Sequence, residues 1–153
     1  MGCVCCIGGC RMFKNVITLF NRYEDRNDDT CKWYANVLEN VELQKITSVT
    51  VDKAGNKSAD TVKLHIPYSS GYMVGELVYL KPKEWYRREN KDSTITLKTG
   101  DFFVEGKLKK GIYDDAEYAR GLFSYIHSNY DDVYTISSIS SYDVIQHFEV
   151  GAN

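Results

Sequence analysis

The sequence predicts a mainly β (α+β) protein, a small β-barrel or sandwich of about six to eight strands with a projecting hairpin and two helices. The clearest hairpin pattern is residues 132–150, DVYTISSISSYDVIQHFEV, because apolar and polar side chains alternate in its second arm. One face carries Val144, Phe148 and Val150, and the other carries Ile145, His147 and Glu149. The 12 Tyr and only 2 Pro also favour strands and interfaces, where tyrosine buries its ring and keeps its hydroxyl wet.

Length and cysteine distribution predict one domain behind a short leader. The chain of 153 residues can bury one continuous core, which we place at residues 12–153. Residues 1–11 are expected to form a flexible, Cys-rich leader, with a second usable start at Met12. Its cysteines, Cys3, Cys5, Cys6 and Cys10, lack the two C-x2-C pairs of a typical zinc site, and Cys6 stands where a myristoylation signal needs Ser or Thr.

Charge and hydropathy disfavour two kinds of partner. The 19 Lys and Arg against 21 Asp and Glu leave a formal charge of -2, which disfavours a basic nucleic-acid binder. No apolar run approaches the roughly 18 to 20 residues that cross a bilayer, so we expect no membrane partner.

The first two strands are expected at residues 16–23 and 32–43, on either side of a charged loop at residues 24–30. The second strand is expected to turn Trp33, Ala35 and Val37 inward. Its pattern is interrupted at Glu39 and Asn40 before apolar residues resume. Such an interruption is typical of a bulge at the corner of a small barrel.

The projecting hairpin is expected to pair residues 46–51 with residues 61–66. The polar tract 52–60 lies between them, and Gly55 and Asn56 are predicted to supply the positive-φ positions of its loop. The outgoing strand is rich in Thr and Ser and only weakly amphipathic. An arm that cannot bury both faces in its own domain usually finds a partner, by strand addition or by packing.

A short helix is predicted near residues 82–90, because Pro82 suits a first helical position and strong helix formers follow. Trp85 and Tyr86 are expected to plug the end of the core. Residues 94–98 and 102–105 are predicted to form another hairpin around a turn at Thr99, Gly100 and Asp101.

An amphipathic helix is predicted near residues 115–128. Asp114 is expected to be its N-cap, with Glu117 completing a capping box. The apolar stripe consists of Ala119, Leu122, Phe123 and Ile126. The closing hairpin that follows is expected to meet the first strand and form the seam of the barrel.

A search for catalytic or cofactor-binding patterns finds none. His65, His127 and His147 lie far apart in the sequence and lack metal-binding spacing, so a metal triad is not expected. The sequence contains no G-x-S-x-G elbow, no P-loop and no calcium loop, and no base neighbours Cys31. We therefore expect no catalytic residue, no cofactor and no enzyme activity.

A resemblance rests on several short phrases from Met12 onward. They are MFKNVITLFNRYED, KWYANVLENVEL, SADTVKLHIPY, LKPKEWYRREN, TITLKTGDFFVEG and the closing YTISSIS and DVIQHFEV. Together they resemble an uncharacterised family of small structural proteins from long-tailed (siphovirus-like) bacteriophages and prophages. The chain is also loosely similar to head-closure, or head–tail connector, proteins, which are small β-barrels that form rings beneath the portal.

The resemblance implies a neck subunit of a virion that is assembled in the host cytoplasm. Its partners would be copies of itself in a ring, a portal or adapter protein, and a tail or tail-terminator protein, with genomic DNA passing through the lumen without sequence-specific binding. The interface is expected on the hairpin and beside the amphipathic helix. The candidate residues are Thr47, Val49, Val51, Lys53, Asn56, Lys57, Tyr118 and Tyr125.

Two alternatives stay open. The chain departs from a minimal connector by its insert at residues 81–90 and its helix at residues 114–128, so a tail-terminator or tail-completion subunit competes. An OB-like barrel that binds nucleic acid is the alternative from another class, although such barrels interleave basic residues with aromatics on one face.

Overall fold

The computed structural model describes residues 14–52 and 55–153, so the whole of the predicted leader, residues 1–11, lies outside them. One antiparallel sheet forms the centre of the molecule. Its strands are β1 (Asn15–Asp25), β2 (Thr30–Asp52), β3 (Gly55–Pro67), β7 (Phe102–Glu105), β8 (Gly111–Asp114), β9 (Val133–Tyr142) and β10 (His147–Ala152).

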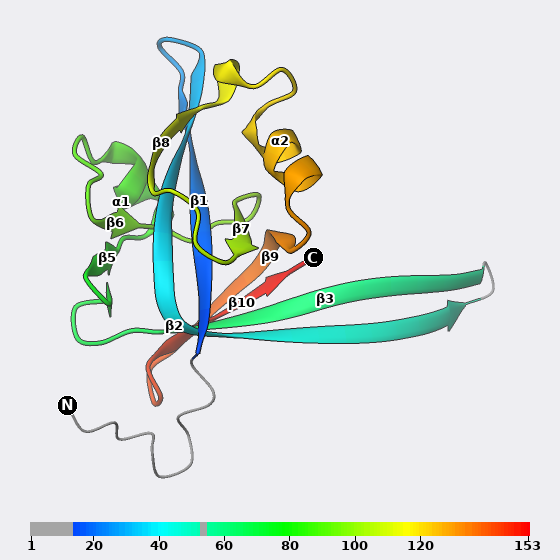
Figure 1. Cartoon of the computed structure of the whole chain (residues 1–153). Coiled ribbons are helices and arrows are strands. Elements are labelled where there is room, and N and C mark those ends of the chain that lie inside the picture. Colours follow the sequence, from blue (N-terminus) through cyan, green and yellow to red (C-terminus); the bar gives the residue numbers. More distant parts are fainter. Residues whose placement is uncertain (1–13, 53–54) are drawn as a thin grey trace.

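The sheet closes into the predicted barrel (Figure 1). Six strands follow the order β1-β7-β9-β10-β3-β2, and the ring is complete because β2 also pairs with β1. Strand β8 extends the sheet on β2. Closure gives every strand of the ring two neighbours and so removes open edges.

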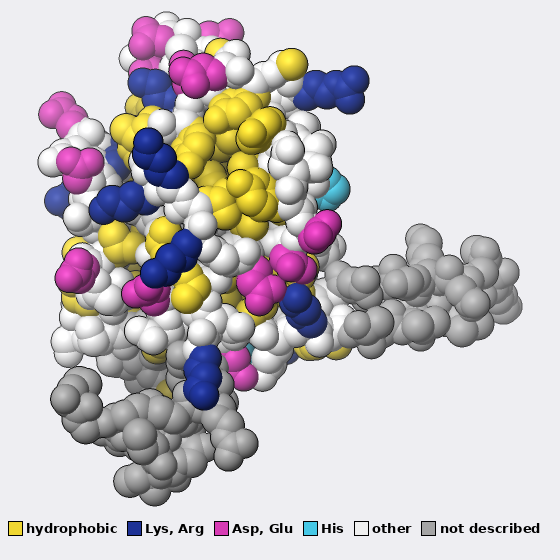
Figure 2. Space-filling view, viewed as in Figure 1, with side chains coloured by type: hydrophobic (Ala, Val, Ile, Leu, Met, Phe, Trp, Pro, Cys, Tyr) yellow, Lys and Arg dark blue, Asp and Glu magenta, His cyan; other side chains and the backbone are white. Residues whose placement is uncertain are grey.

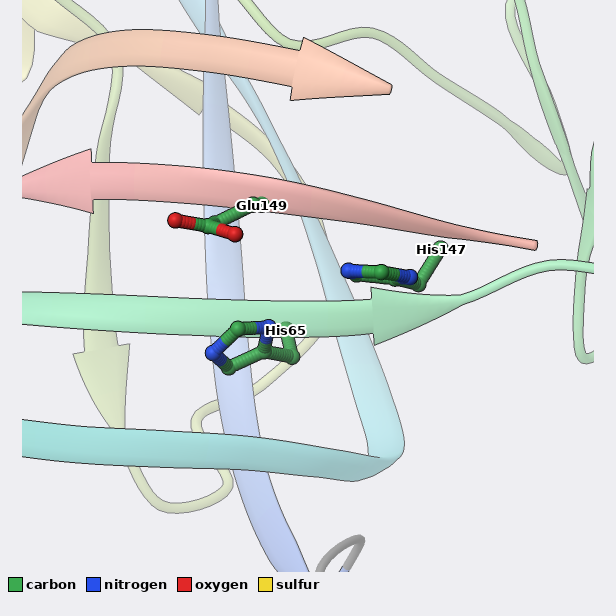
Figure 3. Close-up of side chains that lie close together, drawn as sticks. All are labelled: His65, His147 and Glu149. Carbon is green, nitrogen blue, oxygen red and sulfur yellow. The ribbon is translucent and has the colours of Figure 1, made fainter. Parts of the chain in front are cut away.

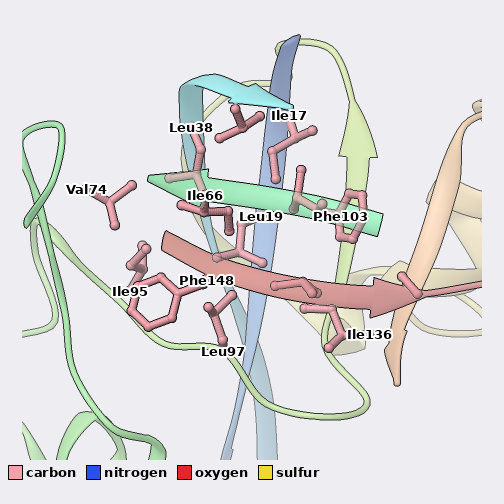
Figure 4. Packing of buried hydrophobic residues seen from close by; sticks show 14 of the residues in the cluster. Ile17, Leu19, Leu38, Ile66, Val74, Ile95, Leu97, Phe103, Ile136 and Phe148 are labelled. Atoms are coloured by element: carbon pink, nitrogen blue, oxygen red, sulfur yellow. The ribbon is translucent and has the colours of Figure 1, made fainter. Parts of the chain in front are cut away.

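The core fills the interior of this barrel (Figure 4). Alternate residues of the strands point inward, as the period-2 pattern predicts, and Leu19, Leu64 and Val150 are fully buried. Phe103 from β7 and Phe148 from β10 supply the largest fully buried side chains of this cluster. The barrel is therefore packed with side chains.

The predicted corner in β2 is confirmed at Asn40, which adopts a positive φ of 57°. Ile17 pairs with Leu38, whereas Asn15 pairs with Val41, so β2 holds an extra residue between these pairs. The bulge lets both Leu38 and Val41 point into the core although three positions separate them. Trp33 and Ala35, predicted to face this core, instead join a second cluster on the other side of the sheet.

That second cluster lies between the outer face of the sheet and helix α2 (Leu122–Asn129). The rings of Phe20 and Phe102 stack with centroids 4.6 Å apart, and the Trp33 ring meets Phe102 at 4.9 Å. Leu122 and Ile126 cover these rings from the helix. Strands β1 and β7 are consequently buried on both faces here.

Helix α2 is shorter than the predicted helix near residues 115–128. Residues Asp115–Glu117 form a 3-10 turn instead, and α2 begins only at Leu122. Gly121 breaks the path with a positive φ of 88°. Asp114 is an N-cap as predicted, but of the 3-10 turn: its carboxylate accepts from the N–H of Ala116. The first N–H of α2, that of Leu122, is instead bound by the Asp115 carboxylate at 2.7 Å.

A small second sheet lies beside the barrel and contains β4 (Met73–Val74), β5 (Leu77–Tyr79) and β6 (Thr94–Ile95). The predicted hairpin of residues 94–98 with residues 102–105 is wrong. Strand β6 pairs in parallel with β5, and β7 pairs with β1 and β9. The hairpin does not form because the Asn21 side chain binds both backbone groups of Thr96. It accepts from the Thr96 N–H at 3.2 Å and donates to the Thr96 carbonyl at 2.7 Å.

Helix α1 (Pro82–Arg87) has proline in its first turn, as predicted, but ends before residues 88–90. Trp85 is fully buried and its ring packs 5.5 Å from that of Tyr34. Tyr86 is 38% exposed, so Trp85 alone plugs this end of the molecule. The ammonium group of Lys91 lies 5.2 Å from the centroid of the Trp85 ring.

The closing hairpin consists of β9 and β10, with Val144 and Ile145 in the exposed turn between them. The predicted direct contact of this hairpin with the first strand is wrong. Strand β7 lies between β1 and β9, because Phe102 and Phe103 pair with both neighbours. Phe148 and Val150 face the core as predicted, whereas Val144 does not.

Candidate assembly surfaces

The β2–β3 hairpin leaves the barrel as an arm (Figure 1). We call the paired residues from Ile46↔Thr61 to Asp52↔Gly55 the arm. The third strand, β10, pairs with β3 only from Val62 to Pro67. Beyond that point, among residues 14–52 and 55–153, β2 and β3 pair only with each other, over roughly 20 Å at about 3.3 Å per residue.

The predicted loop at residues 52–60 is much shorter in the structure. Asp52 pairs with Gly55 and Val51 pairs with Asn56, so the strands continue almost to the tip. Gly55 and Asn56 belong to β3 and are not the loop residues that the sequence indicated. The alternation of Thr, Ser and Val sustains the strand through this polar stretch.

Charged residues hold the root of the arm to the barrel. The Lys45 ammonium lies 3.0 Å from the carboxylate of Glu105 and 3.3 Å from that of Asp132. The hydrogen bond to Glu105 raises the pKa of Lys45 above its usual range. Lys45 thus ties β2 to β7 and to the start of β9 where the arm emerges.

The predicted interface residues of the hairpin lie on the arm. Thr47, Val49 and Val51 are in β2, where they pair with Asp60, Ser58 and Asn56. Lys57 is in β3 and pairs with Thr50. Lys53 lies outside the described residues.

The second predicted surface surrounds Tyr118 and Tyr125. Their ring centroids are 4.9 Å apart, and Tyr125 is 49% exposed. Both line a shallow depression with Arg120 and Asn129. Partial burial raises the pKa of Tyr118, so its hydroxyl stays protonated and available as a hydrogen-bond donor at neutral pH.

Hydrophobic side chains gather on the face that carries β8 and α2 (Figure 2). Ile112 of β8 and Tyr130 at the end of α2, which were not predicted from the sequence, are also exposed, at 59% and 44%. Aromatic residues with one wet end are enriched at protein interfaces. The tyrosine surface, which we define as Tyr118 and Tyr125, is on other elements than the arm, so the predicted residues lie on two separate surfaces.

The structure also brings together two histidines that the sequence places far apart. The ring centroids of His65 on β3 and His147 on β10 are 5.5 Å apart, and Glu149 lies beside them. His127 is on α2 and packs against Phe123. Alternation in the sequence places His65 on the polar face of one strand, and His147 and Glu149 on the polar face of another. The pairing of β3 with β10 joins these two faces into a single surface.

Membrane spanning by a helix finds no support among the described residues, where neither α1 nor α2 is long and apolar enough. Comparison with curated proteins and with solved structures finds no match. Comparison with protein families matches residues 12–153 to a family described as "Family of unknown function (DUF6751)". The match covers the barrel, the arm and both helices, and the chain therefore belongs to the DUF6751 family.

Proposed function

We propose that this protein is a structural subunit of a bacteriophage virion that assembles with copies of itself into a ring. Within the virion we place it in the neck, as a head-closure or head–tail connector protein between portal and tail. The placement rests on the resemblance of its sequence phrases to small phage structural proteins. The ring itself rests on the arm.

The arm is the observation that carries the proposal. A two-stranded hairpin without a third strand or a core is marginally stable in water. Within the described part of the chain, residues 46–52 and 55–61 have backbone pairing only with each other, so no described strand covers either outer edge of the ribbon. Open edges favour strand addition or packing by another chain.

A second copy of this chain is the partner that suits the arm. Residues 46–61 carry two Lys and two Asp, so the arm has no net charge and does not repel its own copy. The tyrosine surface offers a separate patch on the same subunit. Two different surfaces that meet head to tail generate a closed ring if the rotation between neighbours closes.

The experiment compares the full chain with a variant whose residues 47–60 are replaced by Asn-Gly. That turn joins Ile46 to Thr61 as a tight hairpin and leaves the barrel pairs intact. Native mass spectrometry should find the full chain as a discrete multiple of 17.5 kDa and the variant as a monomer. The melting temperature of the variant should be close to that of the full-chain monomer, because the replacement keeps the buried residues Val62, Leu64 and Ile66 of β3 in place.

Val144→Ser is the matched control, since Val144 is fully exposed in the β9–β10 turn, away from both surfaces. It should leave the assembly unchanged. Mass spectrometry of purified particles tests the virion placement, and a tail-terminator would be found in the tail fraction rather than the neck. A protein that is monomeric at every concentration and absent from virions would contradict the proposal. If that monomer bound oligonucleotides in a salt-dependent manner, the result would support the OB-like alternative.

A further inference from the structure

Three polar side chains meet on the outer face of the barrel where β3 and β10 pair (Figure 3). His65 is directly opposite Glu149, and His147 is opposite Pro67 at the next outward position. Their neighbours Leu64, Ile66 and Phe148 point into the core and are buried. Strands with one face locked in the core hold the outward residues in a fixed register.

The arrangement brings ligand atoms into range of a single ion. One nitrogen of each histidine and one carboxylate oxygen of Glu149 all lie within 4.8 Å of one another. Tetrahedral ligands of Zn²⁺, bound at about 2.0–2.2 Å, are separated by roughly 3.3 Å. All three side chains are partly exposed, so rotations that move each ligand atom by roughly 1 Å close the site.

His147 is already oriented for this role. Its Nδ1 lies 2.6 Å from the carbonyl oxygen of Ile145. Because a carbonyl only accepts, Nδ1 carries the proton and Nε2 has the free lone pair. The Tyr142 ring stacks on the imidazole with centroids 5.0 Å apart and planes 12° apart, which fixes its plane. A backbone carbonyl behind a ligating histidine is the usual support of a metal ligand.

Glu149 has a competing partner. The Lys63 ammonium lies 3.2 Å from its carboxylate, and the Lys63 side chain is half exposed. Such an exposed ion pair is weak, so a divalent cation displaces the ammonium easily. Lys63 therefore tunes metal affinity without being a ligand.

We propose that His65, His147 and Glu149 form a binding site for a divalent transition-metal ion of the Zn²⁺ class. Two imidazoles and one carboxylate suit Zn²⁺, Co²⁺ or Ni²⁺, whereas Ca²⁺ and Mg²⁺ prefer oxygen ligands. Three protein ligands leave a coordination position open to water or to an outside ligand. The ion joins β3 to β10 beside the root of the arm. This proposal departs from the sequence-based expectation that the histidines bind no metal.

The test measures Zn²⁺ binding by calorimetry on the untagged full chain. Cys3, Cys5, Cys6 and Cys10 are replaced by serine in all samples, so that thiolates do not bind the metal. One Zn²⁺ should bind per chain, and at about 100 times Kd the melting temperature should rise by about 5–10 °C. Co²⁺ should give visible bands of nitrogen and oxygen ligation, and Ca²⁺ should leave the melting temperature unchanged.

Variants separate this site from adventitious binding. His147→Gln and Glu149→Gln should each weaken Zn²⁺ binding by at least about tenfold. Lys63→Ala should tighten it about two- to fivefold, because the competing ammonium is gone. His127→Gln is the control histidine and should change nothing.

Circular dichroism of each metal-free variant checks that it folds. If a variant of a ligand residue does not fold, the comparison of Lys63→Ala with the parent still tests the site. Equal Zn²⁺ affinity in the parent, Glu149→Gln and Lys63→Ala proteins would overturn the proposal. The absence of any Zn²⁺-dependent heat or melting shift would do the same. Neither result depends on whether the chain forms a ring.

Discussion

The barrel end and the arm end of the β2–β3 hairpin are parts of the same two strands, yet their surroundings differ completely. At the barrel end, Val62, Leu64 and Ile66 are buried in the core and β10 pairs with β3. At the arm end, β2 and β3 pair only with each other among the described residues. Both the third strand and the buried side chains therefore distinguish the barrel end from the arm end.

The difference teaches that this hairpin has two sources of stability. Burial of apolar surface stabilises its barrel end within one chain. The arm has the marginal stability of an isolated two-stranded ribbon until another chain covers it. Substitutions at the two ends should therefore differ in whether they change the folding of one chain or its association.

Leu64→Ala should have the largest effect on folding, because Leu64 is fully buried in the barrel core. The expected loss in the free energy of unfolding is about 2–5 kcal/mol, measured by urea denaturation. Val49→Ala, in the arm of the same hairpin, is the matched comparison and should change the unfolding of the monomer by less than about 0.5 kcal/mol. Equal losses at the two positions would show that the arm belongs to the folded core.

Asp101→Asn should come next, because the buried Asp101 carboxylate accepts from Asn21 Nδ2 at 2.8 Å and from the N–H of Arg22 at 3.1 Å. An amide supplies only one acceptor, so a buried donor loses its partner. We expect a loss of about 1–3 kcal/mol at neutral pH. Asp28→Asn, in the exposed turn between β1 and β2, is the control.

Asp101→Asn also tests how the stability of the barrel depends on pH. Burial raises the pKa of Asp101 above 3.8, although Lys98 and the hydrogen bonds oppose the shift. The folded state then binds a proton more readily than the unfolded state, so this group stabilises most below pH 3.8 and loses that contribution as pH rises through the folded pKa. The stability difference between parent and Asp101→Asn should grow as pH falls through this window, and a constant difference would contradict the raised pKa.

Asp115→Ala should have a smaller effect and tests the layer outside the barrel. The Asp115 carboxylate accepts from the N–H of Leu122 and, at 3.0 Å, from Trp33 Nε1. Its loss removes the cap of α2 and leaves the indole without that acceptor, at a cost of about 1–2 kcal/mol in thermal denaturation. Asp114→Ala removes only the cap of the exposed 3-10 turn. It should lower the free energy of unfolding by a few tenths of the loss expected for Asp115→Ala.

Lys45→Ala at the root of the arm should have the smallest effect. Its ion pairs with Glu105 and Asp132 are about half exposed, and such pairs contribute about 0–1 kcal/mol. Urea denaturation should show a loss near 0.5 kcal/mol that disappears in about 1 M NaCl, because salt screens exposed charges. A loss that persists in high salt would mean that Lys45 acts by packing and that the arm is joined to the barrel more firmly than we infer.

Local patterns alone were enough to predict much of the fold. Alternation identifies β1, β2, β3, β9 and β10, and the break at Asn40 predicts the bulge that β2 contains. Pro82 indicates the start of α1, and the arm follows from an outgoing strand that is rich in Thr and Ser and only weakly amphipathic. These features depend on a residue and its near neighbours, which set backbone preference and side-chain direction.

Tertiary structure decided which strands meet. Strand β7 has the alternation of a hairpin partner for residues 94–98, but barrel closure places it between β1 and β9. The Asp115 carboxylate accepts from Trp33 Nε1 on β2, a contact that joins residues 82 positions apart in the sequence. His65 faces Glu149 only because β10 pairs with β3. A strand's own periodicity says which side is buried but not against which neighbour, and that choice depends on the free energy of closing the whole barrel.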